Sequence, residues 1–290
     1  MDRRNAAKGV MAALGGSLLL SSNRVVAQDK AAAPAPAAPS GGEGTLARIQ
    51  RTKTFRVAGL VGEEPYFSKD LATGQWSGFC IEMARDIAKE LDVKLEILES
   101  TWGNSVLDLQ SNKIDVSFGL NPTPKRALVI DFSAPLFFNS FTIVTSKKFK
   151  ARTWRELNDP KVRIAVDLGS SHELIARRFA GRATITALKN RDEAILAVQS
   201  GRADCFVATI FLGLTALKKN PQLGMFVIPQ PPVQSAVCAA FQYDNDRRFR
   251  DFMTAWANFN RGNGQTKEWI LAALAKQDIK PEDIPPEMTF

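Results

Sequence analysis

Residues 102–135 bring an aromatic side chain, a loop of small residues and an arginine together at fixed spacing, in the sequence WGNSVLDLQSNKIDVSFGLNPTPKRALVIDFSAP. The planar guanidinium of Arg126 can donate hydrogen bonds to both oxygens of a carboxylate, and such charge-assisted bonds are about twice as strong as neutral ones. The flat indole of Trp102 can cover an aliphatic or cationic group, which contributes about 0.5–2 kcal/mol for a cation. The segment therefore predicts a site for a small carboxylate. The alternatives are a surface ion pair for Arg126 and a core position for Trp102.

Several short patterns in this segment recur in the order found in a known family. They are Trp102 and Leu109 followed by Lys-Ile-Asp at 113–115, then T-P-K-R at 123–126, then F-S-x-P at 132–135. On these patterns the chain resembles the family 3 extracellular solute-binding proteins, from about residue 48 to about residue 269. The resemblance implies capture of a polar amino acid or a similar carboxylate for an ABC importer in the inner membrane.

The resemblance also implies roles for single residues. Arg126 is expected to bind the α-carboxylate of the ligand, and Trp102 to stack on the ligand. The loop residues Gly119, Asn121 and Thr123 are expected to supply further hydrogen bonds, although Asn121 stands where relatives usually have serine or threonine.

A second contribution is expected from the turn at residues 168–172, which resembles the G-[ST]-[ST] turn of the family. Ser170 and Ser171 would place the free amide groups of a helix N-terminus against the same carboxylate. The alternative is a simple serine N-cap, and both can hold together. His172, the one histidine of the sequence, is expected to be an exposed helix residue, because no catalytic partner lies at useful spacing.

The chain departs from the family where the ligand amine should be held. Relatives usually have an aspartate at the position of Thr209, and a neutral hydroxyl cannot balance a buried ammonium group. Either Glu63 or Glu64 compensates for this loss, or the ligand has no α-amine. A solvated pair of glutamates is the third possibility.

Strand and helix patterns alternate along the chain in two runs. Period-two and period-four apolar patterns predict strands at 54–60, 93–98, 114–118, 162–166, 183–188 and 203–208, and helices at 79–91, 104–110, 171–179 and 191–199. Extended apolar segments at 137–145 and 233–241 lie between and after the two runs. No internal repeat is evident in the sequence itself. Together with the resemblance, this order predicts an α/β fold: a bilobal, type II periplasmic-binding-protein clamshell with two crossover hinge strands.

The predicted organisation has four parts. Residues 1–27 have the basic start, short apolar run and small cleavage residues of a signal peptide for the Sec or twin-arginine route, which predicts a periplasmic location. Residues 28–44 form an Ala/Pro/Gly linker that is expected to be disordered. Lobe 1 is predicted at 45–142 and 236–290, and lobe 2 at 143–235.

Charge and cysteine content exclude some classes of protein. The formal net charge is +8, but part of this excess lies in the predicted signal peptide and the rest is scattered, so no nucleic-acid site is expected. Cys80, Cys205 and Cys238 lie in apolar surroundings without metal-ligand spacing, which predicts buried thiols. A disulfide between Cys205 and Cys238 is the alternative.

Three functions compete on these grounds. The first is a receptor that binds a small carboxylate for an ABC permease, as a monomer without cofactor or metal and without enzymatic activity. The second is a lyase of the cyclohexadienyl-dehydratase type, which resembles these receptors. The third is a ligand-sensing module for a membrane partner.

Overall fold

The structure is a computed structural model that describes residues 43–286, 288 and 290 of the chain. The predicted signal peptide and all but the last two residues of the predicted linker lie outside the described residues. Within the described ranges, no helix combines the length and the apolar character that a membrane crossing requires.

The first α/β run forms a parallel sheet in which β1 lies between β4 and β5. Helix α2 covers this sheet with Phe79, Met83 and Ile87, which are four residues apart on one face and fully buried. The elements of this run are β1 (Thr54–Leu60), α2 (Phe79–Glu90), β4 (Lys94–Ser100), α3 (Asn104–Gln110) and β5 (Val116–Leu120).

The second run repeats this order, with β8 between β9 and β10 in parallel pairing. The predicted helices at 171–179 and 191–199 have the same bounds in the structure. Helix α8 (Ile210–Lys219) follows β10 directly and was not predicted. The other elements of this run are β8 (Arg163–Asp167), α6 (Ser171–Phe179), β9 (Thr184–Leu188), α7 (Arg191–Gln199) and β10 (Cys205–Thr209).

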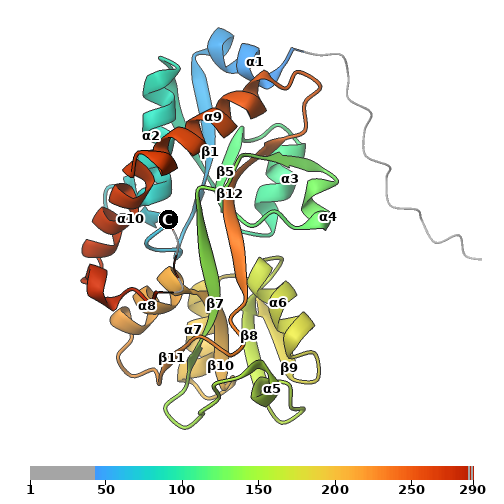
Figure 1. Ribbon diagram of the computed structural model, residues 1–290, viewed down its shortest axis with the longest axis vertical. Helices are drawn as coiled ribbons and strands as arrows, with labels where there is room; N and C mark the ends of the chain where they lie inside the picture. Colours follow the sequence, from blue (N-terminus) through green and yellow to red (C-terminus); the bar gives the residue numbers. More distant parts are fainter. Residues whose placement is uncertain (1–42, 287, 289) are drawn as a thin grey trace, which may run out of the picture. The chain divides into compact units, whose positions relative to one another are not determined.

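Two long strands, β7 (Phe137–Thr145) and β12 (Gln234–Gln242), connect the runs and lie side by side (Figure 1). They pair antiparallel from Phe137 with Val237 to Ser140 with Gln234. Beyond this segment, β7 pairs with β10 and β12 pairs with β5. The result is one sheet in the order β4-β1-β5-β12-β7-β10-β8-β9. The predicted bilobal α/β fold with two crossover strands is confirmed, and we call the β4-β1-β5 part lobe 1 and the β10-β8-β9 part lobe 2. The predicted residue boundaries of the lobes stay a prediction.

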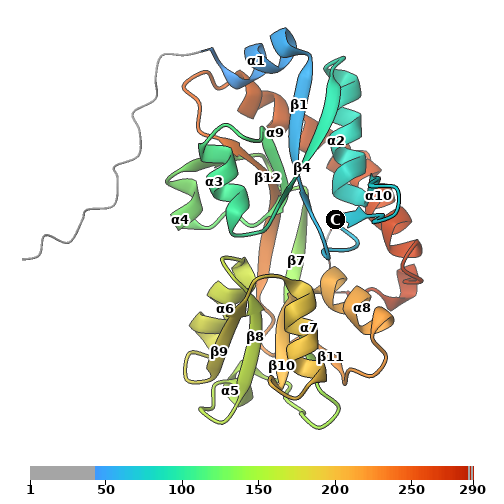
Figure 2. The same ribbon diagram turned by 180° about the vertical axis from the view of Figure 1, so that it is seen from behind.

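The C-terminal helices pack on lobe 1, where α10 lies beside α2 (Figure 2). Trp256 and Trp269 stack with ring centres 5.9 Å apart. The remaining elements are α1 (Thr45–Thr52), β2 (Ser68–Lys69), β3 (Trp76–Ser77), α4 (Pro124–Ala127), β6 (Ile130–Phe132), α5 (Trp154–Leu157), β11 (Phe226–Val227), α9 (Arg248–Gly262), α10 (Gln265–Ala275) and the 3-10 helix η1 (Pro281–Asp283).

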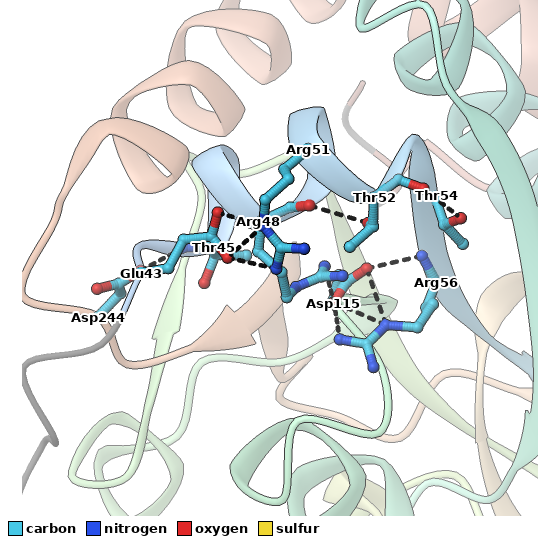
Figure 3. Close-up of polar contacts among 9 residues, drawn as sticks. All are labelled: Glu43, Thr45, Arg48, Arg51, Thr52, Thr54, Arg56, Asp115 and Asp244. Atoms are coloured by element: carbon cyan, nitrogen blue, oxygen red, sulfur yellow. Dashed lines mark hydrogen bonds and ion pairs between the residues drawn. The ribbon is translucent and has the colours of Figure 1, made fainter.

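An arginine–aspartate clamp holds the strands of each lobe together. In lobe 1, the Asp115 carboxylate accepts hydrogen bonds from the backbone N–H of Arg56 at 2.8 Å and from its Nη2 at 2.6 Å (Figure 3). Arg48 of α1 forms an ion pair with the same carboxylate at 2.5 Å. In lobe 2, Asp204 accepts the same two bonds from Arg163, at 2.8 and 2.5 Å. Asp115 directly precedes β5 and Asp204 directly precedes β10, while the arginines lie on the neighbouring strands β1 and β8. The two lobes therefore share one stabilising device that the sequence did not reveal as a repeat.

All three cysteines are buried free thiols, as predicted. Cys238 pairs with Leu120 of lobe 1, whereas Cys205 pairs with Ile164 and Thr145 in lobe 2. The alternative of a Cys205–Cys238 disulfide is therefore wrong, because the two residues lie on strands of different lobes.

Candidate functional site

A pocket lies at the carboxyl ends of strands β5, β8 and β10, where helices of both lobes begin. Its lining leaves about 320 Å³ of space, part of which is open to solvent. Seven of the ten predicted site residues line it: Trp102, Gly119, Asn121, Arg126, Ser170, Ser171 and Thr209.

The other three predicted residues lie elsewhere. Thr123 lines a neighbouring surface groove and accepts a hydrogen bond from the backbone N–H of Arg126 at 3.3 Å, which caps the short helix α4. Glu63 lines an adjacent cavity, and Glu64 lines a third one, where it pairs with Lys219 at 3.3 Å. The assignment of all ten residues to ligand binding stays a prediction.

Arg126 is a partly buried cation whose partners are neutral. Its Nη1 donates to the carbonyl oxygen of Asn121 at 3.1 Å, and its Nη2 donates to the carbonyl oxygen of Gly169 at 3.1 Å. Among the described residues, no carboxylate forms an ion pair with it. Burial lowers the pKa of Arg126 to about 10, so the guanidinium remains charged near neutral pH. An incompletely paired buried cation of this kind favours the binding of an anion.

The facing side of the pocket is built on the start of α6. Ser170 caps this helix, accepting from the backbone N–H of Glu173 at 3.3 Å. The Ser171 hydroxyl donates to Asn121 Oδ1 at 2.6 Å, which joins the two lobes directly. The simple N-cap interpretation therefore holds for Ser170, while Ser171 takes part in a contact between the lobes.

An aromatic wall closes one side of the pocket. Trp102 is 7% exposed and meets Tyr66 edge-on, with ring centres 6.2 Å apart. Gly119 has a φ of +85°, and a Cβ atom at this position would lie 3.1 Å from each of these two rings. Only glycine therefore fits here without displacing the wall. Tyr66, which was not predicted from the sequence, accepts a hydrogen bond from Asn139 Nδ2 at 2.9 Å.

Thr209 ends β10 and points a neutral group at the pocket. The side chain is 4% exposed, and its Oγ1 makes no hydrogen bond of standard geometry in the described part of the chain, although the Tyr66 hydroxyl lies near enough to interact with it. The neighbouring Tyr66 hydroxyl has a pKa well above its usual range, because burial disfavours the phenolate. Both hydroxyls are therefore neutral, and a ligand atom could satisfy Thr209.

A buried group of four ionisable residues, which we call the charged cluster, lies next to the pocket: Glu63, Asp167, His172 and Arg191. Arg191 forms an ion pair with Asp167, approaches Glu63 Oε2 at 3.9 Å and donates to His172 Nδ1 at 3.1 Å. All four side chains are at most 4% exposed. The possibility of a solvated glutamate is therefore wrong for Glu63.

The expectation that His172 is exposed is also wrong. The ring lines the pocket and packs edge-on against Phe141, with ring centres 6.0 Å apart. The second residue of α6 faces inward here, because the capped first turn starts at the carboxyl edge of the sheet. In the sequence, the indication of this cluster is limited to two charged residues: Asp167 at the end of β8 and Arg191 at the start of α7.

Burial and pairing set the protonation of the cluster. Burial raises the pKa of Glu63 to about 8, although Arg191 opposes this rise. Burial also disfavours ionised Asp167, but Arg191 and His172 more than offset this effect and its pKa is lowered. Burial and then Arg191 lower the pKa of His172. Near neutral pH the cluster therefore combines ionised Asp167 and Arg191 with a neutral histidine and a largely protonated Glu63.

Comparison with known proteins identifies the class to which this fold and pocket belong. The model of the bacterial extracellular solute-binding proteins, family 3, matches residues 56–278. The chain belongs to this family.

Two relatives and one solved structure illustrate the range of its members. Cyclohexadienyl dehydratase of Pseudomonas aeruginosa is 24% identical over 229 residues, covering 78% of this chain and 84% of the relative. A probable amino-acid ABC transporter-binding protein of Haemophilus influenzae is 25% identical over 206 residues, covering 71% and 79%. The crystal structure of the ancestral amino acid-binding protein AncCDT-1, a precursor of cyclohexadienyl dehydratase, is 29% identical with a TM-score of 0.71, and the match covers 81% of this chain and 99% of that one. Both binding proteins and an enzyme thus occur among the relatives.

Proposed function

We propose that this protein is a periplasmic solute receptor that binds a small carboxylate, an amino acid or a close analogue, and delivers it to an inner-membrane ABC permease. The observation that carries the proposal is Arg126, a partly buried guanidinium that faces the pocket with only neutral carbonyl partners. A ligand carboxylate is a stronger acceptor than a carbonyl. Ser171 on the opposite lobe then lies within the same pocket, so a bound carboxylate can link the lobes.

Hinge closure around a ligand is the usual motion of such receptors. Here β7 and β12 supply the two crossings. Direct contacts between the lobes, from Arg126 to Gly169 and from Ser171 to Asn121, border the pocket. These contacts support a mechanism in which the ligand carboxylate and the two lobes stabilise one another.

A titration series tests this proposal. Wild-type protein is screened by thermal shift against amino, hydroxy and keto acids, and hits are measured by calorimetry. A ligand at 100 times its dissociation constant stabilises the fold by about 2.7 kcal/mol. Arg126→Ala should remove this stabilisation, because truncating one partner of a desolvated charge pair costs about 2–5 kcal/mol of binding.

The neighbouring Lys125 provides a matched control. It is exposed and is absent from the pocket lining, so Lys125→Ala removes one positive charge without touching the site. Equal loss of affinity in both variants would point to a general charge effect and contradict the carboxylate clamp.

A dehydratase of the type found among the relatives is a second candidate, and one observation favours it. Glu63 is buried, and its raised pKa of about 8 keeps an acid protonated near neutral pH, which is a property of general acids. Trp102 lines both the pocket and the cavity of Glu63. If this candidate is right, purified protein mixed with prephenate or arogenate forms product, and Glu63→Gln abolishes this activity. Absence of turnover would exclude the dehydratase and leave the receptor as the remaining candidate.

A further inference from the structure

Arg191 places a positive charge permanently inside the protein next to the pocket. It is the first residue of α7, and its side chain is only 2% exposed. Nη1 donates to the carbonyl oxygen of Val207 at 2.8 Å, and Nη2 forms an ion pair with Asp167. These bonds fix the guanidinium in lobe 2.

The partners of Arg191 come from both lobes. Glu63 follows β1 of lobe 1, and its Oε2 lies 3.9 Å from Arg191 Nη2 without a hydrogen-bond partner. Asp167 closes β8 of lobe 2, and its Oδ1 also lacks a partner. The two acids line the same cavity, which shares Trp102 with the pocket. At this end of the site, one internal cation therefore pairs with ionised Asp167 and lies beside protonated Glu63.

This arrangement leaves the pocket without an acid for a ligand cation. His172 separates Arg191 from the pocket and is neutral, since its pKa is lowered by burial and by Arg191. Thr209, on the adjoining strand, is neutral as well. Among the described residues that line the pocket, the charged group without an opposite charge is Arg126. A ligand ammonium or guanidinium would add a second uncompensated cation, which is unfavourable when desolvated.

We propose that Arg191 is a built-in counter-cation that takes the place of a cationic ligand group, so that the ligand is a carboxylate whose remaining atoms carry no positive charge. The chemical class is that of 2-hydroxy and 2-oxo acids with an uncharged side chain. This inference rests on the receptor function proposed above. Under this proposal, Arg191 and Thr209 together determine that the protein binds 2-hydroxy or 2-oxo acids and not amino acids.

Matched ligands test the ligand class on wild-type protein. Each set contains one side chain with three groups at C2: L-leucine with 2-hydroxy-4-methylpentanoate and 4-methyl-2-oxopentanoate, and L-phenylalanine with 3-phenyllactate and phenylpyruvate. L-arginine and L-lysine complete the panel. In calorimetry, a hydroxy or oxo acid should bind at least tenfold more tightly than its amino acid, and L-arginine should not bind. An amino acid that binds as tightly as its matched acids overturns the inference.

A chemical-rescue experiment tests Arg191 directly. Arg191→Ala leaves a space of guanidinium size beside Asp167, so millimolar methylguanidinium should raise the melting temperature of this variant by several degrees. Wild type and Arg191→Lys, which keep an internal cation, should not respond. Arg191→Ser, which leaves nearly the same space, is used for this measurement if the alanine variant does not fold. Equal responses of variant and wild type overturn the role of Arg191.

The two arms separate the inference from the function on which it rests. If no acid of the panel stabilises the wild type, the receptor for small carboxylates fails, and rescue by methylguanidinium then reports only on the charged cluster. If acids bind but amino acids bind equally well, the receptor function stands and the inference about ligand charge fails.

Discussion

Arg126 and Gly169 are joined by a hydrogen bond from Nη2 to the carbonyl oxygen, 3.1 Å long, that crosses from lobe 1 to lobe 2 beside the pocket. A carbonyl is a weaker partner for a guanidinium than a carboxylate is. A ligand carboxylate can therefore compete for Arg126, and the bond to Gly169 couples its arrival to the relative position of the two lobes.

Trp102 is expected to report this event by fluorescence. Its indole lines the pocket and is 7% exposed, and its Nε1 lies near Glu63 without a hydrogen bond of standard geometry among the described residues. A bound ligand changes the polarity at this ring, so emission should shift on titration. Trp102→Phe should remove the shift and weaken binding less than Arg126→Ala does, because it leaves an aromatic ring in the wall of the pocket and the carboxylate clamp intact. Trp256, which stacks on Trp269, is the matched control, because Trp256→Phe should leave the shift intact. An unchanged signal in Trp102→Phe would assign Trp102 to the core.

Glu63 predicts a defined dependence of stability on pH. Its folded pKa of about 8 exceeds the ordinary value of 4.5, so the folded state holds a proton that the unfolded state releases. The stabilisation is complete below about pH 4.5 and is lost as pH rises toward 8. His172 has a lowered pKa and acts in the opposite direction around its ordinary value of 6.5. Glu63→Gln cannot titrate, so the free energy of unfolding of the wild type minus that of this variant reports the contribution of Glu63. This difference should decrease as pH rises from 5 to 8. A difference that stays flat in urea titrations across this range contradicts a protonated Glu63.

The two arginine–aspartate clamps predict unequal losses of stability. The Asp115 side chain is fully buried and serves both Arg48 and Arg56, whereas the Asp204 side chain is 19% exposed and pairs with Arg163. Removing one partner of a buried pair costs about 3–5 kcal/mol, which we expect for Asp115→Ala. A hydrogen bond to a charged group contributes about 1.5–3 kcal/mol, which sets the expectation for Asp204→Ala. Urea midpoints measure both variants, and equal losses would show that burial does not determine the cost.

Local patterns in the sequence were enough to predict most of the fold and the carboxylate side of the pocket. Helices α6 and α7 were predicted residue for residue, because their caps and apolar period lie within nine residues. Asn121 precedes helix α4, and Arg126 lies within that helix five residues later, so their proximity could be inferred from spacing.

Contacts between distant residues could not be predicted in this way. Arg56 and Asp115 are 59 residues apart, and Arg163 and Asp204 are 41 apart, so the shared clamp emerges only when the strands pair. Arg191 and Asp167 are likewise brought together from different elements. Charged residues at the ends of helices and strands are usually exposed to solvent. Asp167 and Arg191 are buried instead, because they lie at the carboxyl ends of the strands, where the two lobes face each other.

Thr209 provides the last prediction, because it presents a neutral hydroxyl to the pocket where the family resemblance implies an aspartate. Its Oγ1 is buried beside the Tyr66 hydroxyl and makes no hydrogen bond of standard geometry in the described part of the chain. Thr209→Asp would place a carboxylate in a pocket that otherwise holds the cation Arg126. Amino acids should then bind at least tenfold more tightly, about 1.4 kcal/mol, because their ammonium group gains an opposite charge. Hydroxy and oxo acids should bind more weakly. Their own carboxylate occupies Arg126, so the introduced carboxylate at position 209 stays desolvated without a cation, which is unfavourable. Thr209→Asn, which has nearly the same shape and no charge, is the control and should not gain affinity for amino acids. If the wild type already binds an amino acid tightly, and Glu63→Gln or Glu64→Gln weakens it, the amine is held from lobe 1 and Thr209 does not determine the ligand class.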